Sequence, residues 1–197
     1  MKKILFAVNT MGRAGAETAL IELLNALHFP DYKLYLYVIM GQGEMIERLP
    51  SHVKLLNKRF SSQSVLTRKG KWVMARTICK AFFRNGGYGR KLGSVFRNAE
   101  EMKKNGKIQA DKLLWRVLSD GGQRFQETFD LAVAYLEGAA AYYVAEHVKA
   151  RRKAAFIHID YTSAGYTRRM DQGCWERFDR IFGVSYEVRE SFLSVYP

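Results

Sequence analysis

Residues 3–15, Lys-Ile-Leu-Phe-Ala-Val-Asn-Thr-Met-Gly-Arg-Ala-Gly, decide the fold class of this 197-residue chain. The apolar run from Lys3 to Val8 is typical of a strand buried on both faces of a parallel sheet. Small residues form a turn up to Gly15, and apolar residues then recur at spacings of three and four from Ala19 to Leu27. This spacing predicts a helix from Ala16 to about His28. A buried strand, a tight turn and a helix begin the βαβ unit of a doubly wound α/β sheet.

The rest of the chain continues this pattern around one long interruption. Further strands are expected at 33–40, 53–56, 130–136, 154–159 and 180–184, and helices at 44–49, 139–148 and 187–195. Ser185 is the expected cap of the last helix, and residues 160–173 are expected to form a polar loop. The interruption is predicted to be mostly helical, with breaks at 85–87 and 105–106 and a last helix at 110–118. The prediction is a single Rossmann-like domain over residues 1–197, a mainly parallel sheet with a basic helical insert at about 58–125.

The net charge of +13 lies in this insert. Residues 58–124 hold 17 Lys and Arg against 4 Asp and Glu, whereas the remainder holds 15 of each sign. One face of a predicted helix carries cations and another carries apolar residues: Lys69, Arg76, Lys80 and Arg84 on the first, Trp72, Ala75, Cys79, Phe82 and Phe83 on the second. Such a helix suits an anionic membrane or a polyanionic ligand. It equally fits a helix whose apolar side packs on its own domain while its cations are solvated.

Other features exclude several classes of protein. Cys79 and Cys174 are too few for a disulfide scaffold and lack the spacing of a metal site, so no metal is expected. The first apolar run is too short for a signal-peptide core or a membrane span. We therefore expect a soluble, cytoplasmic protein.

Candidate site residues are those that follow the predicted strands, because open α/β sheets bind ligands outside the carboxyl ends of their strands. Gly12 and Gly15 allow a ligand to approach the backbone, and the helix start offers free N–H groups to an anion. Alternatively, these glycines only serve tight turns. The Gly-x-Gly-x-x-Gly fingerprint is missing, because Ala14 stands two residues after Gly12 and Ile46 three after Gly43. This disfavours a nicotinamide-dependent oxidoreductase.

Three further candidates follow later strands. His158 lies near the end of a predicted strand, and Asp160 stands two residues on, on the same side of the pleat. A histidine in this place can act as a hydrogen-bond donor or general base with a carboxylate to orient it. It can also simply be bonded to a backbone carbonyl under the loop. Glu137 ends the preceding strand and either shares the crevice with His158 or holds a neighbouring loop.

Several motifs occur here in the order in which they occur in group 1 (family 4) glycosyltransferases. They are the turn from Gly12 to Glu17, Gly41-Gln42-Gly43-Glu44 leading to Leu49-Pro50, and the segments 129–138, 156–160 and 178–185. The chain resembles bacterial members that build capsular, exopolysaccharide or other cell-envelope glycans. The resemblance covers nearly the whole chain and is weakest in the basic insert. Ala14 departs from the Gly-Gly-Ala-Glu that the family commonly carries in the first turn.

This resemblance implies the acceptor-side, amino-terminal domain of a retaining, metal-independent enzyme of GT-B architecture. The family's nucleotide-sugar domain, with its Glu-x7-Glu motif, has no counterpart before Pro197, so we expect that domain to be absent and this chain alone to be inactive. By resemblance, a nucleotide-sugar such as a UDP-sugar serves as the donor, and a glycan or a lipid-linked molecule is the acceptor, with no further cofactor. Gly12, Gly15 and Glu17 would lie near the donor phosphates.

The resemblance also implies that His158 lies near the reacting centre, with Asp160 or Glu137 as its polar neighbour. The insert would draw the domain to the anionic inner face of the cell membrane. The alternative is a stand-alone basic module that binds nucleic acid or an anionic membrane. Nucleic acid is disfavoured, because no RNA- or DNA-binding motif is readable in the sequence.

Overall fold

The computed structural model describes the backbone of residues 1–197 and the side chains of residues 1–109 and 112–197. Its centre is a six-stranded sheet in the order β3-β2-β1-β4-β5-β6, with every neighbouring pair parallel. The strands are β1 (Lys2–Val8), β2 (Tyr32–Val38), β3 (Val53–Leu55), β4 (Phe129–Ala134), β5 (Ala150–Ile157) and β6 (Arg180–Gly183). The chain order reverses between β1 and β4, which makes this the topological switch point of the sheet. The predicted Rossmann-like α/β fold is confirmed.

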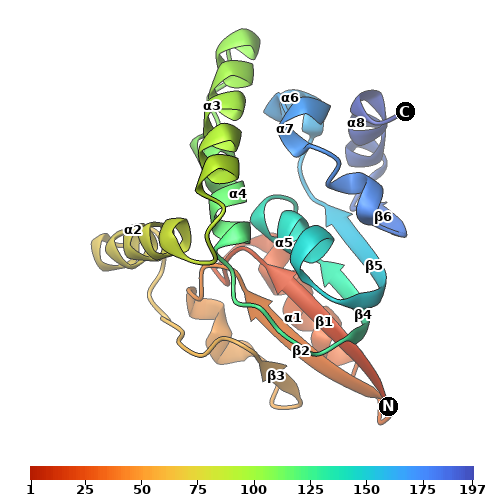
Figure 1. Ribbon diagram of the computed structural model, residues 1–197. Helices are drawn as coiled ribbons and strands as arrows, with labels where there is room; N and C mark the ends of the chain where they lie inside the picture. The colour runs from red at the N-terminus through yellow and green to blue at the C-terminus, as the bar shows by residue number, and fades with distance from the viewer.

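Helices cover both faces of the sheet, as Figure 1 shows. Ile4, Phe6 and Val8 of β1 pack in one core with α1 (Gly15–Ala26), whereas Leu5 and Ala7 pack in a second core with α5 (Ala139–His147). Side chains of a strand alternate between its two faces. The uninterrupted apolar run of β1 follows from this, because both of its faces are buried.

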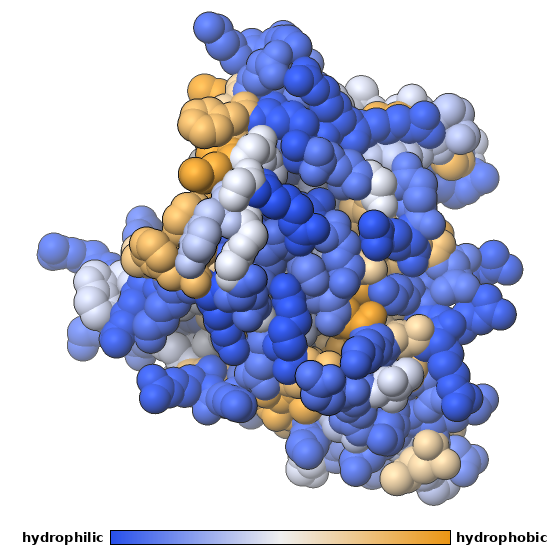
Figure 2. Space-filling model, viewed as in Figure 1, coloured by the Kyte–Doolittle hydropathy of each residue, from blue (hydrophilic) through white to orange (hydrophobic). Residues whose placement is uncertain are grey.

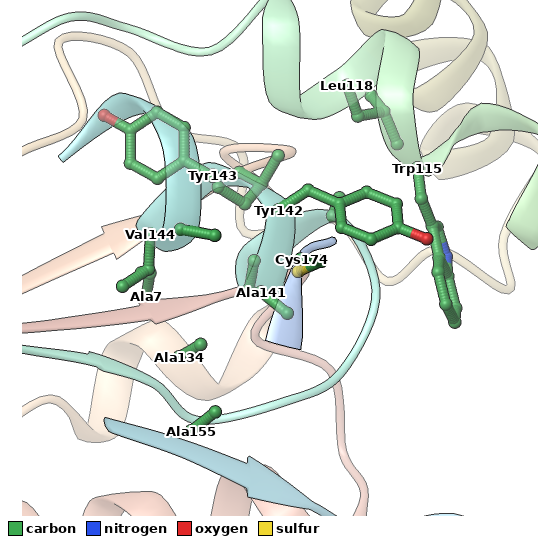
Figure 3. Packing of buried hydrophobic residues seen from close by; sticks show 14 of the residues in the cluster. Ala7, Trp115, Leu118, Ala134, Ala141, Tyr142, Tyr143, Val144, Ala155 and Cys174 are labelled. Atoms are coloured by element: carbon green, nitrogen blue, oxygen red, sulfur yellow. The ribbon is translucent and has the colours of Figure 1, made fainter. Parts of the chain in front are cut away.

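The core beneath α5 is built from small residues (Figure 3). Ala7, Ala134 and Ala155 come from the neighbouring strands β1, β4 and β5, and each is fully buried. Above them lie Ala141 and Val144 of α5, also fully buried. Small side chains on both surfaces let the helix lie close to the sheet, so that the interior is densely packed.

The insert between β3 and β4 is helical, as predicted. It consists of α2 (Arg68–Phe83), α3 (Tyr88–Asn105) and α4 (Ala110–Asp120), and α3 extends away from the sheet (Figure 1). The two breaks fall where the backbone turns left-handed, at residues 85–87 and at Gly106. Helix α4 packs on α5. None of the helices in the described part of the chain is long and apolar enough to cross a bilayer.

The packed face of α2 differs from the apolar face expected from its sequence. Gly70 and Ala81 are the buried residues of α2, and Met74, Ile78 and Phe82 pack partly against the core. Trp72 and Phe83, both expected on the apolar side, are each 65% exposed, and Cys79 is also exposed. Close packing selects the small residues: a Cβ at Gly70 would lie 1.8 Å from the Ser64 carbonyl oxygen. Of the predicted apolar set, only Phe82 lies on the inner side.

The segment expected to be a polar loop, residues 160–173, instead contains two short helices. These are α6 (Tyr161–Ala164) and α7 (Arg168–Asp171), and Tyr161 and Asp171 are fully buried. A 3-10 turn, η2 (Trp175–Arg177), and α8 (Tyr186–Val195) complete the domain, while η1 (Glu44–Arg48) follows β2. Ser185 caps α8 as predicted, because its side chain accepts a hydrogen bond from the Val188 N–H at 3.2 Å.

Candidate ligand-binding site at the carboxyl edge of the sheet

Asn9 follows β1 and joins the two strands that flank the switch point. Its Nδ2 donates to the carbonyl oxygen of Glu137 at 2.8 Å, and its Oδ1 accepts from the N–H of Ala140 at 2.8 Å. The side chain therefore ties the β1 loop to the first turn of α5. The sequence pointed to the loop after β1, but these contacts span more than a hundred residues and have no local signal.

Glu137 lies beside His158 at this edge and holds the neighbouring loop, which is one of the two roles expected for it. The Glu137 carboxylate accepts a hydrogen bond from the backbone N–H of His158 at 2.9 Å. The imidazole itself packs on Tyr135, with 5.3 Å between ring centroids, and its Nε2 is buried without a hydrogen-bond partner among the described residues. Glu137 thus positions the backbone after β5 and leaves the imidazole nitrogen unpaired.

Three residues that follow strands at this edge hold buried polar atoms without a partner among the described residues. Among the described residues, six hold buried side-chain nitrogen or oxygen atoms without a partner, and three of the six are Gln42, Glu44 and His158. Gln42 and Glu44 follow β2, and His158 follows β5. Buried groups of this kind are rare because they are costly, and each one requires an explanation. Their position favours the carboxyl edge as the place where a ligand binds.

Asp160 does not orient His158, contrary to the sequence prediction. Its carboxylate caps α6 by accepting from the Ser163 N–H at 2.8 Å, and it also accepts from the Ser191 hydroxyl of α8. These hydrogen bonds lower the pKa of Asp160 to about 2. The residue joins α6 to α8. The pleat rule failed here because β5 ends at Ile157, so residue 160 no longer belongs to the strand.

The turn after β1 leaves backbone open to solvent. A Cβ at Gly12 or Gly15 would meet no heavy atom within 4 Å, so the packing of the domain does not require glycine at either position. Helix α1 starts after Ala14, which offers no capping side chain. Arg13 and Arg48 line a hollow of about 380 Å³ at this helix start. Free N–H groups and two guanidinium groups together favour an anion.

Of the three residues that the resemblance placed near the donor phosphates, Gly15 lines this hollow, whereas Gly12 and Glu17 do not. Glu17 is 6% exposed and lies on the inner side of the first turn of α1. Burial raises the pKa of Glu17, and the negative charge of Glu44 adds to the effect. Glu17 is therefore a buried carboxyl group beneath the hollow.

The second pair of glycines serves the fold. Gly43 has a φ of 138°, and a Cβ there would lie 2.2 Å from the backbone of Met11. Gly41 also has a positive φ, of 59°. The backbone conformation of the loop after β2 therefore requires glycine at both positions.

Two further hollows lie where the insert meets the sheet edge. One, of about 350 Å³, is apolar and opens at the switch point beside Asn9. The other, of about 290 Å³, is lined by four cations: Lys58, Arg59, Lys80 and Arg84. Neither could be found from the sequence, because each needs α2 to be placed against the loops that follow the strands.

Several cations of the insert are buried, which the sequence did not indicate. Lys112 is fully buried, and its Nζ lies 2.6 Å from Oδ1 of Asp171 and 4.2 Å from the ring centroid of Tyr166. Asp171 also accepts hydrogen bonds from four aromatic side chains: Tyr142, Tyr161, Trp175 and Tyr196. This buried ion pair fastens α4 of the insert to the carboxyl-terminal helices.

A second polar cluster has the composition of a metal site but is occupied by arginine. Asp120, Glu146 and His147 offer ligand atoms within 4.8 Å of one another. Arg90 pairs with both carboxylates, and Arg116 pairs with Glu146. Burial lowers the pKa of His147, and hydrogen bonds from His147 and Arg90 hold the pKa of Asp120 down in spite of its burial. The cluster is an ion-pair network that joins α3, α4 and α5.

We compared the chain with protein-family models, with curated proteins and with solved structures, and none of the three comparisons gave a match.

Proposed function

We propose that this domain is the acceptor-side domain of a GT-B glycosyltransferase similar to group 1 (family 4), which transfers a sugar from a nucleotide-sugar to a cell-envelope or polysaccharide acceptor. The observation that carries the proposal is the turn after β1. It combines bare backbone at Gly12 and Gly15, an uncapped helix start and the cations Arg13 and Arg48, at the carboxyl edge of a parallel sheet. This is the arrangement that binds the phosphates of nucleotides in α/β sheets.

The residues at the neighbouring strand ends supply the polar groups that such a reaction needs. His158 holds a buried Nε2 without a partner among the described residues, and this nitrogen would accept from or donate to a sugar hydroxyl once the side chain turns toward the bound sugar. Glu137 and Asn9 hold the loops after β1 and β5 in place around it. Arg13 and Arg48 would balance the negative charge of the departing nucleoside diphosphate without a metal ion.

Transfer by the native protein that contains this chain tests the proposal. The protein would be supplied with radiolabelled UDP-sugars and with lipid-linked and glycan acceptors extracted from its source cells. We expect His158→Ala to lower kcat/KM at least about a hundredfold, the effect of removing one polar group that acts in the transition state. Its melting temperature should stay close to that of the wild type. His52→Ala is the matched control, because His52 stacks on His28 away from the carboxyl edge.

Transfer at the wild-type rate by His158→Ala would remove His158 from the site. Absence of transfer from every nucleotide-sugar would overturn the proposed function itself. Arg48→Gln adds a second check, because it should raise the KM for the donor while leaving the KM for the acceptor unchanged.

We also propose that the insert brings the domain to an anionic membrane. No Asp or Glu occurs between Glu47 and Glu100, a stretch that holds 13 Lys and Arg. Apolar side chains are exposed on the same stretch, among them Trp72 of α2 at 65% and Phe96 of α3 at 72%. Figure 2 shows apolar side chains among hydrophilic ones over α2 and α3. Cations beside exposed aromatic residues are the pattern of a surface that binds anionic lipid.

The native thiol of Cys79 gives a direct test. Cys79 is exposed on α2, whereas Cys174 is buried, so a polarity-sensitive fluorophore should label α2 alone. We expect a blue shift on vesicles that contain anionic lipid, none on neutral vesicles, and a loss of binding as salt rises. Salt-sensitive binding to DNA, with no response to anionic vesicles, would instead support the nucleic-acid module.

A further inference from the structure

The apolar hollow at the switch point is formed jointly by the sheet edge and the insert. Asn9, Thr10 and Met40 come from the loops after β1 and β2, and Met74, Ile78 and Leu114 come from α2 and α4. Trp115, Leu118 and Ala139 line the rest of its wall, and all three are buried. Its volume of about 350 Å³ is in the range of pockets that bind small molecules.

The walls of this pocket select hydrocarbon. Both polar atoms of the Asn9 side chain are used in bonds to Glu137 and Ala140, so Asn9 offers no free amide to a ligand. Met74, Ile78 and Leu114 are only partly buried, so apolar surface faces a space that the protein does not fill. A sugar or phosphate placed there would lose its hydrogen bonds to water and would find few hydrogen-bond partners in the pocket to replace them. An apolar chain would lose nothing comparable and would bury further apolar surface.

The cationic hollow lies beside this pocket. Met40 and Leu118 line both the apolar pocket and the cationic hollow. The two also lie along α2, because Ile78 of this helix lines the pocket, and Lys80 and Arg84 at its end line the hollow. Lys58 and Arg59, from the segment after β3, complete the hollow. In the part of the chain whose side chains are described, none of these four cations forms an ion pair with a carboxylate. Four unpaired cations around one hollow favour an anionic group, above all a phosphate.

We propose that the insert binds one molecule of an anionic amphiphile, with the hydrocarbon chain in the apolar pocket and a phosphate on Lys58, Arg59, Lys80 and Arg84. Because the two hollows share Met40 and Leu118 as walls, they lie side by side, and the proposal requires that one molecule carrying both chemistries reaches both. This binding does not depend on sugar transfer. It would place one lipid at the switch point, between the insert and the sheet edge.

Dodecyl phosphate, kept below the concentration at which it forms micelles, is the probe that tests the site. The chain would be titrated with it by calorimetry, and the tryptophan fluorescence would be followed in a Trp72→Phe background, which leaves Trp115 and Trp175. Trp115 is part of the pocket wall, whereas Trp175 lines neither hollow, so a change in emission would report on Trp115. We expect saturable binding of one molecule per chain. Dodecanol, which lacks the phosphate, and inorganic pyrophosphate, which lacks the chain, should each bind at least about tenfold more weakly, the step that one lost favourable contact of ordinary strength produces.

Variants assign the two halves of the site. Ile78→Phe and Leu114→Phe each fill the pocket and should weaken the binding of dodecyl phosphate at least tenfold. If Leu114→Phe fails to fold, Ile78→Phe remains as the test, because Ile78 is only partly buried and leaves room for a larger ring. Lys80→Gln with Arg84→Gln should weaken dodecyl phosphate but leave dodecanol unchanged. Leu92→Ser is the matched control, because Leu92 is an exposed apolar residue of α3 that lines neither hollow.

Three outcomes would overturn the proposal. Wild-type affinity for dodecyl phosphate in a folded Ile78→Phe protein would show that the chain does not enter the pocket. An equal loss in Leu92→Ser would mean that the probe adsorbs to exposed apolar surface. Pyrophosphate binding as tightly as dodecyl phosphate would make the cationic hollow a site for free anions alone.

Discussion

Helices α2 and α4 belong to the same basic insert and use their cations in opposite ways. On α4, Lys112 and Arg116 are buried, and each pairs with a carboxylate from another part of the chain, Asp171 and Glu146 respectively. On α2, the exposed cations Arg76 and Lys80 have no carboxylate partner among the described residues. The net charge of a segment therefore does not reveal the role of its cations. That role depends on where the acidic residues of the rest of the chain lie.

Helix α3 has one packed side and one exposed side. Lys91 is fully buried, and its ammonium group donates to the carbonyl oxygens of Ala81, Phe82 and Arg84 at the end of α2. A cation at this place satisfies carbonyls that a helix end leaves unpaired. Tyr88, Leu92 and Phe96, spaced four residues apart on the same helix, are exposed. One side of α3 therefore fastens the insert, and the other faces solvent.

Removing the buried cation of α4 should give the largest effect on folding. We expect Lys112→Met to lower the free energy of unfolding by about 3–5 kcal/mol, because Asp171 would remain charged and buried without its cation. Adding Asp171→Asn should recover part of this loss, since the uncompensated charge is then gone. Urea unfolding measures both values. Lys69→Met on α2 is the control and should stay within about 0.5 kcal/mol of wild type; a similar loss there would end the distinction between the two helices.

Removing the free cations of α2 should weaken membrane binding and leave folding intact. Arg76→Gln with Lys80→Gln should cost about 1 kcal/mol of vesicle affinity per charge removed. Sedimentation with vesicles of anionic lipid measures this loss, and Lys33→Gln, an exposed cation on β2, provides the control. A fall in the melting temperature of the double variant comparable to that of Lys112→Met would show that the α2 cations also serve the fold.

The amino-terminal cap of α2 tests how firmly this helix is held. The Thr67 hydroxyl oxygen accepts from the Gly70 N–H at 3.0 Å. Replacing this cap, in Thr67→Ala, should cost about 1 kcal/mol of unfolding free energy. Hydrogen exchange should then accelerate in α2 and remain slow in α4. Equal acceleration in both helices would mean that the insert opens as one unit.

Acid should loosen the ion-pair network of α4 and α5. Burial lowers the pKa of His147 below its ordinary value of 6.5, and Arg124 acts in the same direction, whereas Asp120 and Glu146 oppose the shift without cancelling it. The unfolded chain therefore takes up a proton before the folded chain does, so stability is full above pH 6.5 and falls as the pH drops below it. Thermal unfolding between pH 7.5 and about 5 measures the fall. His147→Gln should flatten this dependence, and an unchanged slope would exclude His147 as its source.

Much of the sheet could be predicted because local pattern and burial agree there. Residues 4–8 of β1 and 34–38 of β2 form buried runs without a charged residue, because both faces of these strands are covered. β5 starts at Ala150, whereas the predicted strand starts at residue 154. The first half of the strand was missed because its charged residues, Arg151, Arg152 and Lys153, do not show the apolar pattern of a buried strand. Arg152 finds its partner on the neighbouring segment, where Asp179 lies 2.6 Å away. A strand that begins with charged residues is visible only once its neighbour is known.

The sequence predicted at which edge of the sheet the site residues lie, but it did not predict which partners their side chains contact. Glu137 and His158 were expected at the carboxyl edge and meet there, whereas Asp160 caps α6 and Glu17 is buried beneath its hollow. The strand order brings the loops together, and this order follows from the general rule for parallel sheets. Which atom of each side chain faces its neighbour depends on where each strand ends, and a shift of one or two residues changes it.

The class of fold, the helical nature of the insert and the edge of the sheet where polar loops gather could all be predicted from the sequence alone. These follow from periodicity and from turn residues, which act over a few neighbouring positions. The tertiary structure alone shows which cations are buried and which face of α2 packs against the domain. It also shows that the buried Asp171 pairs with Lys112 and accepts hydrogen bonds from four aromatic side chains. The physical reason is that a charge or an apolar side chain acquires its role from its partners, and these partners lie far away in the chain.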